Sequence, residues 1–358
     1  MVVALKESSA EKKTSTSPSS DSSTSIQNSP LLHLDRDLLE SNYKTLKESN
    51  EINLTNINIS TIEAGTFAGL ANLVFVDLSS NSIELIDGLI FKDLTNVKSL
   101  RLGDNLISRI DARAFKTLVN LVELFLHKNK LISIDAKTFD TQQNLKYLNL
   151  SENRLTYIEP LMFRTLKNLK VLNLSDNQLI IIKGGLFRSL PNLEFLDISN
   201  SSIETLHPQA FQGLANLKRL HLHINKISEL DVKTFVELKK LEELYLNNNR
   251  IKQLQTGLFK NLRSLVYLSL EENDFTSFDT SLFYGLTSLR HLYLTDPFLN
   301  EINKYKDFLA VNIEDINPTV SSDHTNKTPT TTKSKTQQPQ IQNKKYNIFI
   351  FIFCLIPI

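Results

Sequence analysis

The sequence predicts an α/β solenoid, a stack of short coils that each contribute one strand to a parallel sheet. Three observations support this prediction. The chain repeats with a period of about 24 residues, a phenylalanine and an asparagine stand at fixed places in the repeat, and a Leu-x-Leu step recurs with the same period. Such a period indicates repeated units that are too thin to bury a core alone and do so only by stacking.

The Leu-x-Leu step predicts one short strand in each unit. Two leucines with one polar residue between them point to the same side, as alternate residues of a strand do. In the first five of these units the strand residues are Val76, Leu100, Leu124, Leu148 and Leu172, followed by Leu78, Leu102, Leu126, Leu150 and Leu174. Stacked coils then pair these strands side by side in a parallel sheet.

The phenylalanine and asparagine columns have structural explanations. Large aromatic residues at a fixed spacing are expected in the core, here Phe67, Phe91, Phe115, Phe139, Phe163, Phe187, Phe211, Phe235, Phe259 and Phe283. An asparagine amide can both donate to and accept from backbone groups where the chain leaves a strand. This predicts a structural asparagine ladder, interrupted at Ser201, made by Asn81, Asn105, Asn129, Asn153, Asn177, Asn225, Asn249 and Asn273.

The resulting consensus, LxxLxLxxNxIxxIxxxxFxxLxN, covers residues 51–302 and resembles the leucine-rich-repeat family in its 24-residue, extracellular type. The resemblance implies a right-handed horseshoe with the parallel sheet on its concave face and an irregular or short-helical convex side. It also implies a cell-surface adhesion or receptor-type ectodomain. Extracellular members usually carry cysteine-rich caps, which this chain lacks, because Cys354 is its single cysteine.

The segments outside the repeats differ in composition. Residues 1–28 form a Ser/Thr-rich stretch that is expected to be disordered. Residues 29–50 are expected to cap the solenoid. They form either a helix, with Ser29 and Pro30 at its start and apolar residues at helical spacing up to Lys47, or a degenerate first coil. A second helix over residues 303–317 is expected to close the other end.

The carboxy-terminal residues suggest membrane attachment. Residues 318–346 are a Thr/Pro/Gln-rich spacer expected to be disordered, and residues 347–358 are apolar. A polar spacer before a short apolar terminus resembles a glycolipid-anchor signal. The alternatives are peripheral membrane contact or a terminus that is incomplete. The first ten residues contain no apolar stretch typical of a secretory signal.

The composition argues against several functions. Lys plus Arg number 40 and Asp plus Glu 39, so the net charge of +1 predicts no nucleic-acid partner. One cysteine can form neither a disulfide framework nor a cysteine-ligated zinc site within the chain. The sequence has no GxSxG, HExxH, CxxC or phosphate-binding glycine loop. We therefore expect no enzymatic activity, no catalytic residues and no cofactor.

The residues that flank the strand leucines predict the binding site, because they face the open side of the sheet. Aromatic, Arg and His side chains there are typical of protein interfaces, although aromatics also favour strands for structural reasons. His221 and His223 could hold a metal with Asp197 and Glu243, but ordinary surface histidines are the simpler interpretation and we expect no metal. The expected contact residues are Arg101, Phe125, Tyr147, Phe195, Arg219, His221, Tyr245, Tyr267, His291 and Tyr293.

Six N-glycosylation sequons are present, about as many as chance would supply in a chain rich in Asn, Ser and Thr. They begin at Asn53, Asn58, Asn149, Asn173, Asn200 and Asn326. If the sequons at Asn149 and Asn173 are used, their glycans would occupy the middle of the sheet. A protein ligand would then be directed to the later coils.

The sequence thus predicts a non-catalytic module that recognises a protein ligand at the cell surface or outside the cell. One alternative is an intracellular scaffold or regulatory adaptor in the cytoplasm, which the single cysteine and the lack of an export signal favour. A structural component of the extracellular matrix is a second alternative.

Overall fold

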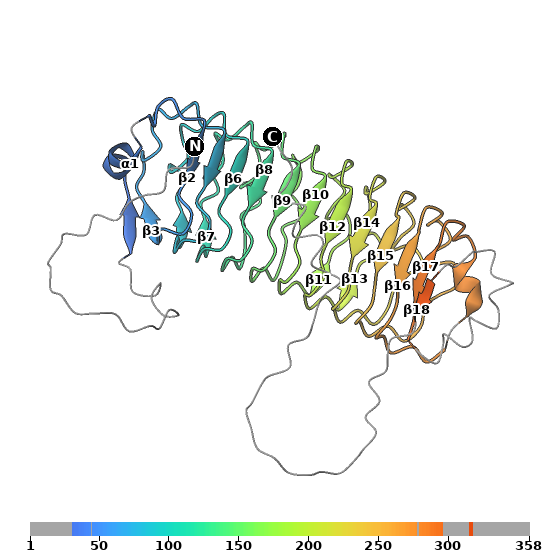
Figure 1. Ribbon diagram of the computed structural model, residues 1–358. Coiled ribbons are helices and arrows are strands. Elements are labelled where there is room, and N and C mark those ends of the chain that lie inside the picture. Colours follow the sequence, from blue (N-terminus) through green and yellow to red (C-terminus); the bar gives the residue numbers. More distant parts are fainter. Residues whose placement is uncertain (1–30, 44, 278, 296–314, 318–358) are drawn as a thin grey trace, which may run out of the picture. The chain divides into compact units, whose positions relative to one another are not determined.

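A computed structural model describes residues 31–43, 45–277, 279–295 and 315–317, which all fall in one compact unit. Its main feature is a sheet of 12 parallel strands, to which successive coils contribute one strand each (Figure 1). In chain order these strands are β2 (Glu51–Asn53), β4 (Phe75–Asp77), β6 (Ser99–Arg101), β8 (Glu123–Phe125), β9 (Tyr147–Asn149), β10 (Val171–Asn173), β12 (Phe195–Asp197), β14 (Arg219–His221), β15 (Glu243–Tyr245), β16 (Tyr267–Ser269), β17 (His291–Tyr293) and β18 (Asp315–Asn317).

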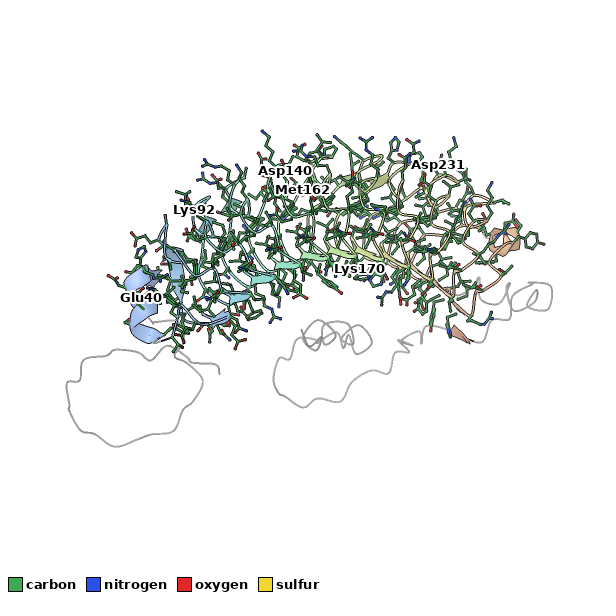
Figure 2. The ribbon with its side chains drawn as sticks, turned by 90° about the horizontal axis from the view of Figure 1, so that it is seen from above. Glu40, Lys92, Asp140, Met162, Lys170 and Asp231 are labelled. Carbon is green, nitrogen blue, oxygen red and sulfur yellow. The ribbon has the colours of Figure 1, made fainter. Side chains whose placement is uncertain are left out.

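The strand register follows the sequence period. Leu172 lies opposite Leu148 on one side and Leu196 on the other, so that each partner is 24 residues away. In each sheet strand from β2 to β17 the middle residue is an apolar side chain that packs inside the coil, and its two neighbours face outward. Figure 2 shows the strands on the inner side of the bend near Lys170, with Asp140 and Asp231 on the outer side. The predicted parallel sheet and solenoid are confirmed.

The phenylalanine column forms a spine through the core, with stacked rings in two runs, Phe67 to Phe139 and Phe163 to Phe259. All ten of its residues, from Phe67 to Phe283, are at most 1% exposed. Neighbouring rings are stacked, with centroids 6.0 Å apart for Phe67 and Phe91 and 6.4 Å apart for Phe187 and Phe211. Within these runs the rings of successive coils pack against one another, which is why the core exists only in the stack.

The asparagine column makes the hydrogen bonds that its place after the strand suggests. Asn153 Nδ2 donates to the carbonyls of Leu126, Leu150 and Ser151, and its Oδ1 accepts from the N–H of Leu131. The other seven asparagines repeat this pattern. The amide thus joins two coils on the side where the chain turns away from the sheet.

A second asparagine ladder runs along the other side of the sheet, and sequence reasoning assigned it no role. Its members are the last residues of the repeat consensus, and each Nδ2 donates to a backbone carbonyl of the preceding coil at 2.8 to 3.0 Å. They are Asn72, Asn96, Asn120, Asn144, Asn168, Asn192 and Asn216. The coils that hold β4 to β10 are therefore tied to the coils before them on both sides of their strands.

The amino-terminal cap is a degenerate coil and not a long helix. Strand β1 (Leu32–Leu34) pairs with β3 (Ile59–Ile62), so a helix cannot run through these residues from Pro30. The helix is confined to α1 (Arg36–Asn42), and its N-cap is Asp35, whose carboxylate accepts from the N–H of Leu38. Tyr43 then donates its hydroxyl hydrogen to the carbonyl of Asn53 at the end of strand β2.

The predicted closing helix over residues 303–317 is wrong at its end. Residues 315–317 form β18, which pairs with β17 in the register of the repeat, with Ile316 opposite Leu292. The sheet hydrogen bonds offered by β17 are available only to an extended chain, and they outweigh the helical spacing of the apolar residues. Residues 303–314, the two expected disordered segments and the apolar tail lie outside the described residues.

The outer side of the coils is mostly turns, as predicted for an irregular convex side. Two short pairs of strands lie there, β5 (Leu85–Ile86) with β7 (Arg109–Ile110), and β11 (Ile181–Ile182) with β13 (Thr205–Leu206). A 3-10 helix, η1 (Thr280–Phe283), follows its N-cap Asp279. Among the described residues no helix is long and apolar enough to cross a membrane.

Candidate ligand-binding face

The outward residues of the sheet strands form two columns, because each strand has the pattern outward, inward, outward. In the later coils these positions hold a cluster that we call the late strip, defined as Phe195, Arg219, His221, Tyr245, Tyr267, His291 and Tyr293. Phe195 is 7% exposed, and the other six side chains are half-buried. All seven are among the predicted contact residues.

The rings of the late strip touch one another in a run that crosses five strands, β12 and β14 to β17. Phe195 meets His221 edge to face at 4.9 Å between centroids, and His221 meets Tyr245 at 4.6 Å. Tyr245 then lies 4.7 Å from Tyr267, and Tyr267 lies 4.9 Å from Tyr293. The run alternates between the two outward columns, because Phe195 and Tyr267 are the first residues of their strands, whereas the other three are the last.

Two further members of the late strip, Arg219 and His291, pack against rings near the ends of this run. The Arg219 guanidinium lies over the Phe195 ring, with Cζ 5.3 Å from the centroid, a distance typical of a cation–π contact. At the other end His291 lies 6.1 Å from Tyr267. The rings are therefore packed against neighbours before any ligand arrives, and they have less rotamer freedom to lose on binding.

One member of the strip, His221, pairs with a carboxylate on the neighbouring strand. His221 Nδ1 is 3.4 Å from Asp197 Oδ2, and Asp197 Oδ1 accepts from the N–H and hydroxyl of Ser199. Burial alone would raise the pKa of Asp197, but the hydrogen bonds from His221 and Ser199 outweigh it and lower that pKa. Burial lowers the pKa of His223 to about 4, so this imidazole is neutral at pH 7.

The two histidines contact each other and a tyrosine of the strip. The rings of His221 and His223 are 5.6 Å apart at 60°, and His223 also lies 6.0 Å from Tyr245. Among the described residues no group of three His, Cys, Asp or Glu side chains is arranged to hold a metal ion. The Nε2 atom of His221 is buried, and no hydrogen-bond partner reaches it.

Arg101 and Phe125, also predicted contact residues, belong to a separate cluster in the early coils. The Arg101 guanidinium lies between two rings, with Cζ 4.9 Å from the centroid of Phe75 and 5.7 Å from that of Phe125. It also pairs with Asp77 at 3.7 Å. Tyr147, the remaining predicted contact residue, is half-buried on β9 between this cluster and the late strip.

A basic groove of about 460 Å³ lies just before the strands that begin the late strip. Glu194 binds two lysines there, Lys170 at 3.2 Å and Lys218 at 3.0 Å, and these hydrogen bonds lower its pKa. Sequence reasoning missed this groove, although lysines recur before the strands. It is lined by Lys146, Asn168, Lys170, Asn192, Glu194, Asn216, Lys218 and Lys240.

The sequons at the centre of the sheet have structural uses of their own. Asn149 Oδ1 accepts from the N–H and hydroxyl of Ser151, and Asn173 Oδ1 accepts from the N–H of Ser175. Asn53 makes the same turn with the N–H of Thr55. These turns satisfy backbone groups at strand ends, so they explain the Asn-x-Ser/Thr pattern without glycosylation.

The other sequons lie elsewhere. Asn58 Oδ1 accepts from the Ser82 hydroxyl, and Asn200 is exposed, with a hydrogen bond to Asp176. Asn326 falls outside the described residues. Of the five described sequon asparagines, Asn53 and Asn200 have the most exposed side chains.

The leucine rich repeat profile matches seven overlapping stretches, residues 76–131, 119–179, 143–203, 180–227, 191–251, 215–275 and 239–299. Together they span more than half of the chain, which therefore belongs to the leucine-rich-repeat family. No curated protein sequence gives a significant match.

Solved structures agree with this assignment. The crystal structure of the TLR13–ssRNA13 complex is similar with a TM-score of 0.69 and 32% identity, over 75% of this chain and 38% of that one. The LRIM1/APL1C complex gives 0.61 and 23%, over 74% and 46%, and the leucine-rich repeat domain of APL1B gives 0.58 and 22%, over 74% and 81%. This chain thus spans less than half of the TLR13 chain, and the two weaker likenesses bear on the fold alone.

Proposed function

We propose that the chain is a non-catalytic recognition module that binds a protein ligand through the late strip. The observation that carries this proposal is the unbroken run of ring contacts from Phe195 to Tyr293 on the sheet face, in which every ring after Phe195 is half-buried. Tyr and Arg provide most of the binding energy in many protein interfaces. The packing of these rings reduces the entropy lost on binding, so the strip is well suited to hold a ligand.

Charge around the strip supports an oriented complex. The basic groove carries four lysines and one glutamate just before the strands from β9 to β15. Toward the later strands, Glu271 and Glu272 directly follow β16, and Glu243 lies on β15. A ligand with acidic residues on one side and basic residues on the other would bind in one direction along the sheet.

The location of the module is part of the proposal. The family resemblance supports the cell surface or the extracellular space, and the exposed sequon at Asn200 is available for a glycan there. If residues 347–358 serve as an anchor signal, deleting them should move the protein from membranes into the medium. A protein that stays in the cytosol, and whose electrophoretic mobility does not change after glycosidase treatment, would favour the intracellular scaffold.

Proximity labelling in intact cells, with the full chain fused to a labelling enzyme, tests the binding site. The Tyr245→Ala/Tyr267→Ala variant should lose the partner that the wild-type chain labels. The recovered partner should bind the purified variant about 30-fold more weakly, the equivalent of about 2 kcal/mol. Tyr284→Ala is the matched control, because Tyr284 is 64% exposed and follows η1, away from the sheet strands.

Normal binding by the double variant, with its thermal stability unchanged, would refute the proposed site. Phe75→Ala should have a much smaller effect on binding, because Phe75 belongs to the early cluster. A partner that depends on Phe75 and not on Tyr245 would place the binding site in the early coils.

A further inference from the structure

After each sheet strand from β2 to β16, one residue adopts a left-handed backbone conformation just before the ladder position. These residues have φ between 46° and 58°, and they are Asn56, Ser80, Asp104, Lys128, Glu152, Asp176, Asn200, Ile224, Asn248 and Glu272. Nine of the ten are polar, and none of those nine is β-branched. Ile224, with φ 53°, is the exception on both counts.

A β-branched residue is strained in this conformation. The left-handed region brings Cβ close to the following carbonyl oxygen, and a branched Cβ adds to that crowding. Asparagine tolerates the region because its short polar side chain bonds locally, and asparagine stands at the equivalent positions in both neighbouring coils, Asn200 and Asn248. The isoleucine is therefore unfavourable for the turn itself.

Core packing does not explain the isoleucine either. Its side chain is 45% exposed, whereas the core residues on either side of this turn, Leu222 and Ile227, are fully buried. The turn is held by backbone bonds that any residue would make, since the N–H of Ile224 donates to the carbonyl of Asn247. Strained residues that the fold does not require are concentrated at functional sites.

Ile224 stands at the edge of the late strip. It directly follows His223, whose ring lies 5.6 Å from His221 and 6.0 Å from Tyr245. Its apolar side chain is 45% exposed and stands one residue after a histidine that contacts the strip, so it adds apolar surface at this edge.

We propose that Ile224 is a binding residue that receives an apolar side chain of the protein ligand at the edge of the late strip. The inference rests on the proposed function, because it assumes a protein ligand on that strip. It adds a requirement for the ligand, which must carry an apolar residue beyond the part that covers the rings. It also explains why a turn that favours asparagine holds an isoleucine.

The Ile224→Asn substitution tests this inference, because it gives the turn the residue of both adjacent coils. Thermal unfolding of the purified full chain should shift upward by about 2 °C as the strain is relieved. Binding is measured with random peptides displayed on phage, selected on the wild-type chain and retained only if Tyr245→Ala/Tyr267→Ala abolishes their binding. These peptides should bind Ile224→Asn about tenfold more weakly.

Two further variants separate the possible causes. Ile224→Leu keeps an apolar side chain without the branched Cβ, so it should retain peptide binding. Lys128→Asn makes the same change of turn residue in the early coils and should leave peptide binding unaltered. We expect Ile224→Asn to gain stability and lose peptide binding, whereas Lys128→Asn should keep normal peptide binding.

The outcomes distinguish this inference from the proposed function. Strip-dependent peptides that bind Ile224→Asn as tightly as wild type would overturn the role of Ile224 and leave the strip intact. A library that yields no peptide dependent on Tyr245 and Tyr267 would contradict the proposed function. An Ile224→Asn chain that is less stable than wild type would show that the isoleucine serves the fold, and would also overturn the inference.

Discussion

Replacement of Asn153 by Leu tests the hydrogen-bond ladder at a single residue. The Asn153 amide makes four hydrogen bonds, three as donor and one as acceptor, and the residue is 7% exposed. A leucine side chain is similar in size but can replace none of these bonds. Its effect on stability therefore depends on which backbone groups are left without a partner.

The three carbonyls that Asn153 serves keep other donors. Leu126 O also accepts from Asn129 Nδ2, Leu150 O from Asn177 Nδ2, and Ser151 O from the N–H of Lys128. The N–H of Leu131, by contrast, loses the acceptor that Asn153 Oδ1 provides.

The variant thus leaves one buried donor unsatisfied, which costs about 1 to 3 kcal/mol. We expect the free energy of unfolding to fall by about 2 kcal/mol. Chemical denaturation of the purified chain, monitored by circular dichroism, measures this change. Asn153→Ser, which imitates the natural interruption at Ser201, should lose less because the side chain stays polar. An Asn153→Leu chain as stable as wild type would refute the reasoning that the ladder satisfies the backbone.

Two further predictions concern stability. Ser201→Asn should raise the free energy of unfolding by about 1 kcal/mol, measured by the same denaturation. The substitution completes the ladder and gives the N–H of Leu179 a side-chain acceptor, like the one that Asn177 gives Leu155 in the preceding coil. A destabilised variant would contradict this. His223 has a folded pKa of about 4, below its ordinary value of 6.5, so between pH 6.5 and 4 the unfolded chain binds a proton that the folded chain excludes. The contribution of His223 to the free energy of unfolding should therefore be constant above pH 6.5 and should fall by up to about 3 kcal/mol as the pH drops to 4. In unfolding curves measured across this pH range, His223→Phe should reduce the dependence of stability on pH.

The sequence predicted the middle of the molecule well because its signals repeat at the distance at which coils make contact. Residues 24 positions apart, such as Leu148 and Leu172, are also partners in the sheet. The ladder asparagines and the phenylalanine spine follow from the same repetition, since each contact joins one coil to the next. Because the same pattern recurs in every repeat, one ambiguous position does not change the prediction of the fold.

The ends were less predictable, because the repeat pattern fades there. Leu31, Leu34 and Leu38 fit a helix by spacing, whereas Leu32 and Leu34 fit a strand, and the pairing of β1 with β3 decides for the strand. Ile316 likewise extends the sheet because β17 offers it hydrogen bonds. Short apolar patterns are ambiguous by periodicity alone, and only the neighbouring element removes the ambiguity.

The sequence by itself determined the solenoid, the sheet register, the core spine and the set of side chains that face outward from the sheet. Only the tertiary structure decided which of those side chains touch. It separated Arg101, held between Phe75 and Phe125, from the late strip. It also assembled the basic groove around Glu194 and gave Ile224 its strained backbone. The reason is physical: periodicity specifies the direction in which a side chain points, whereas its contacts depend on rotamers and on the neighbouring coils, which the repeat pattern does not encode.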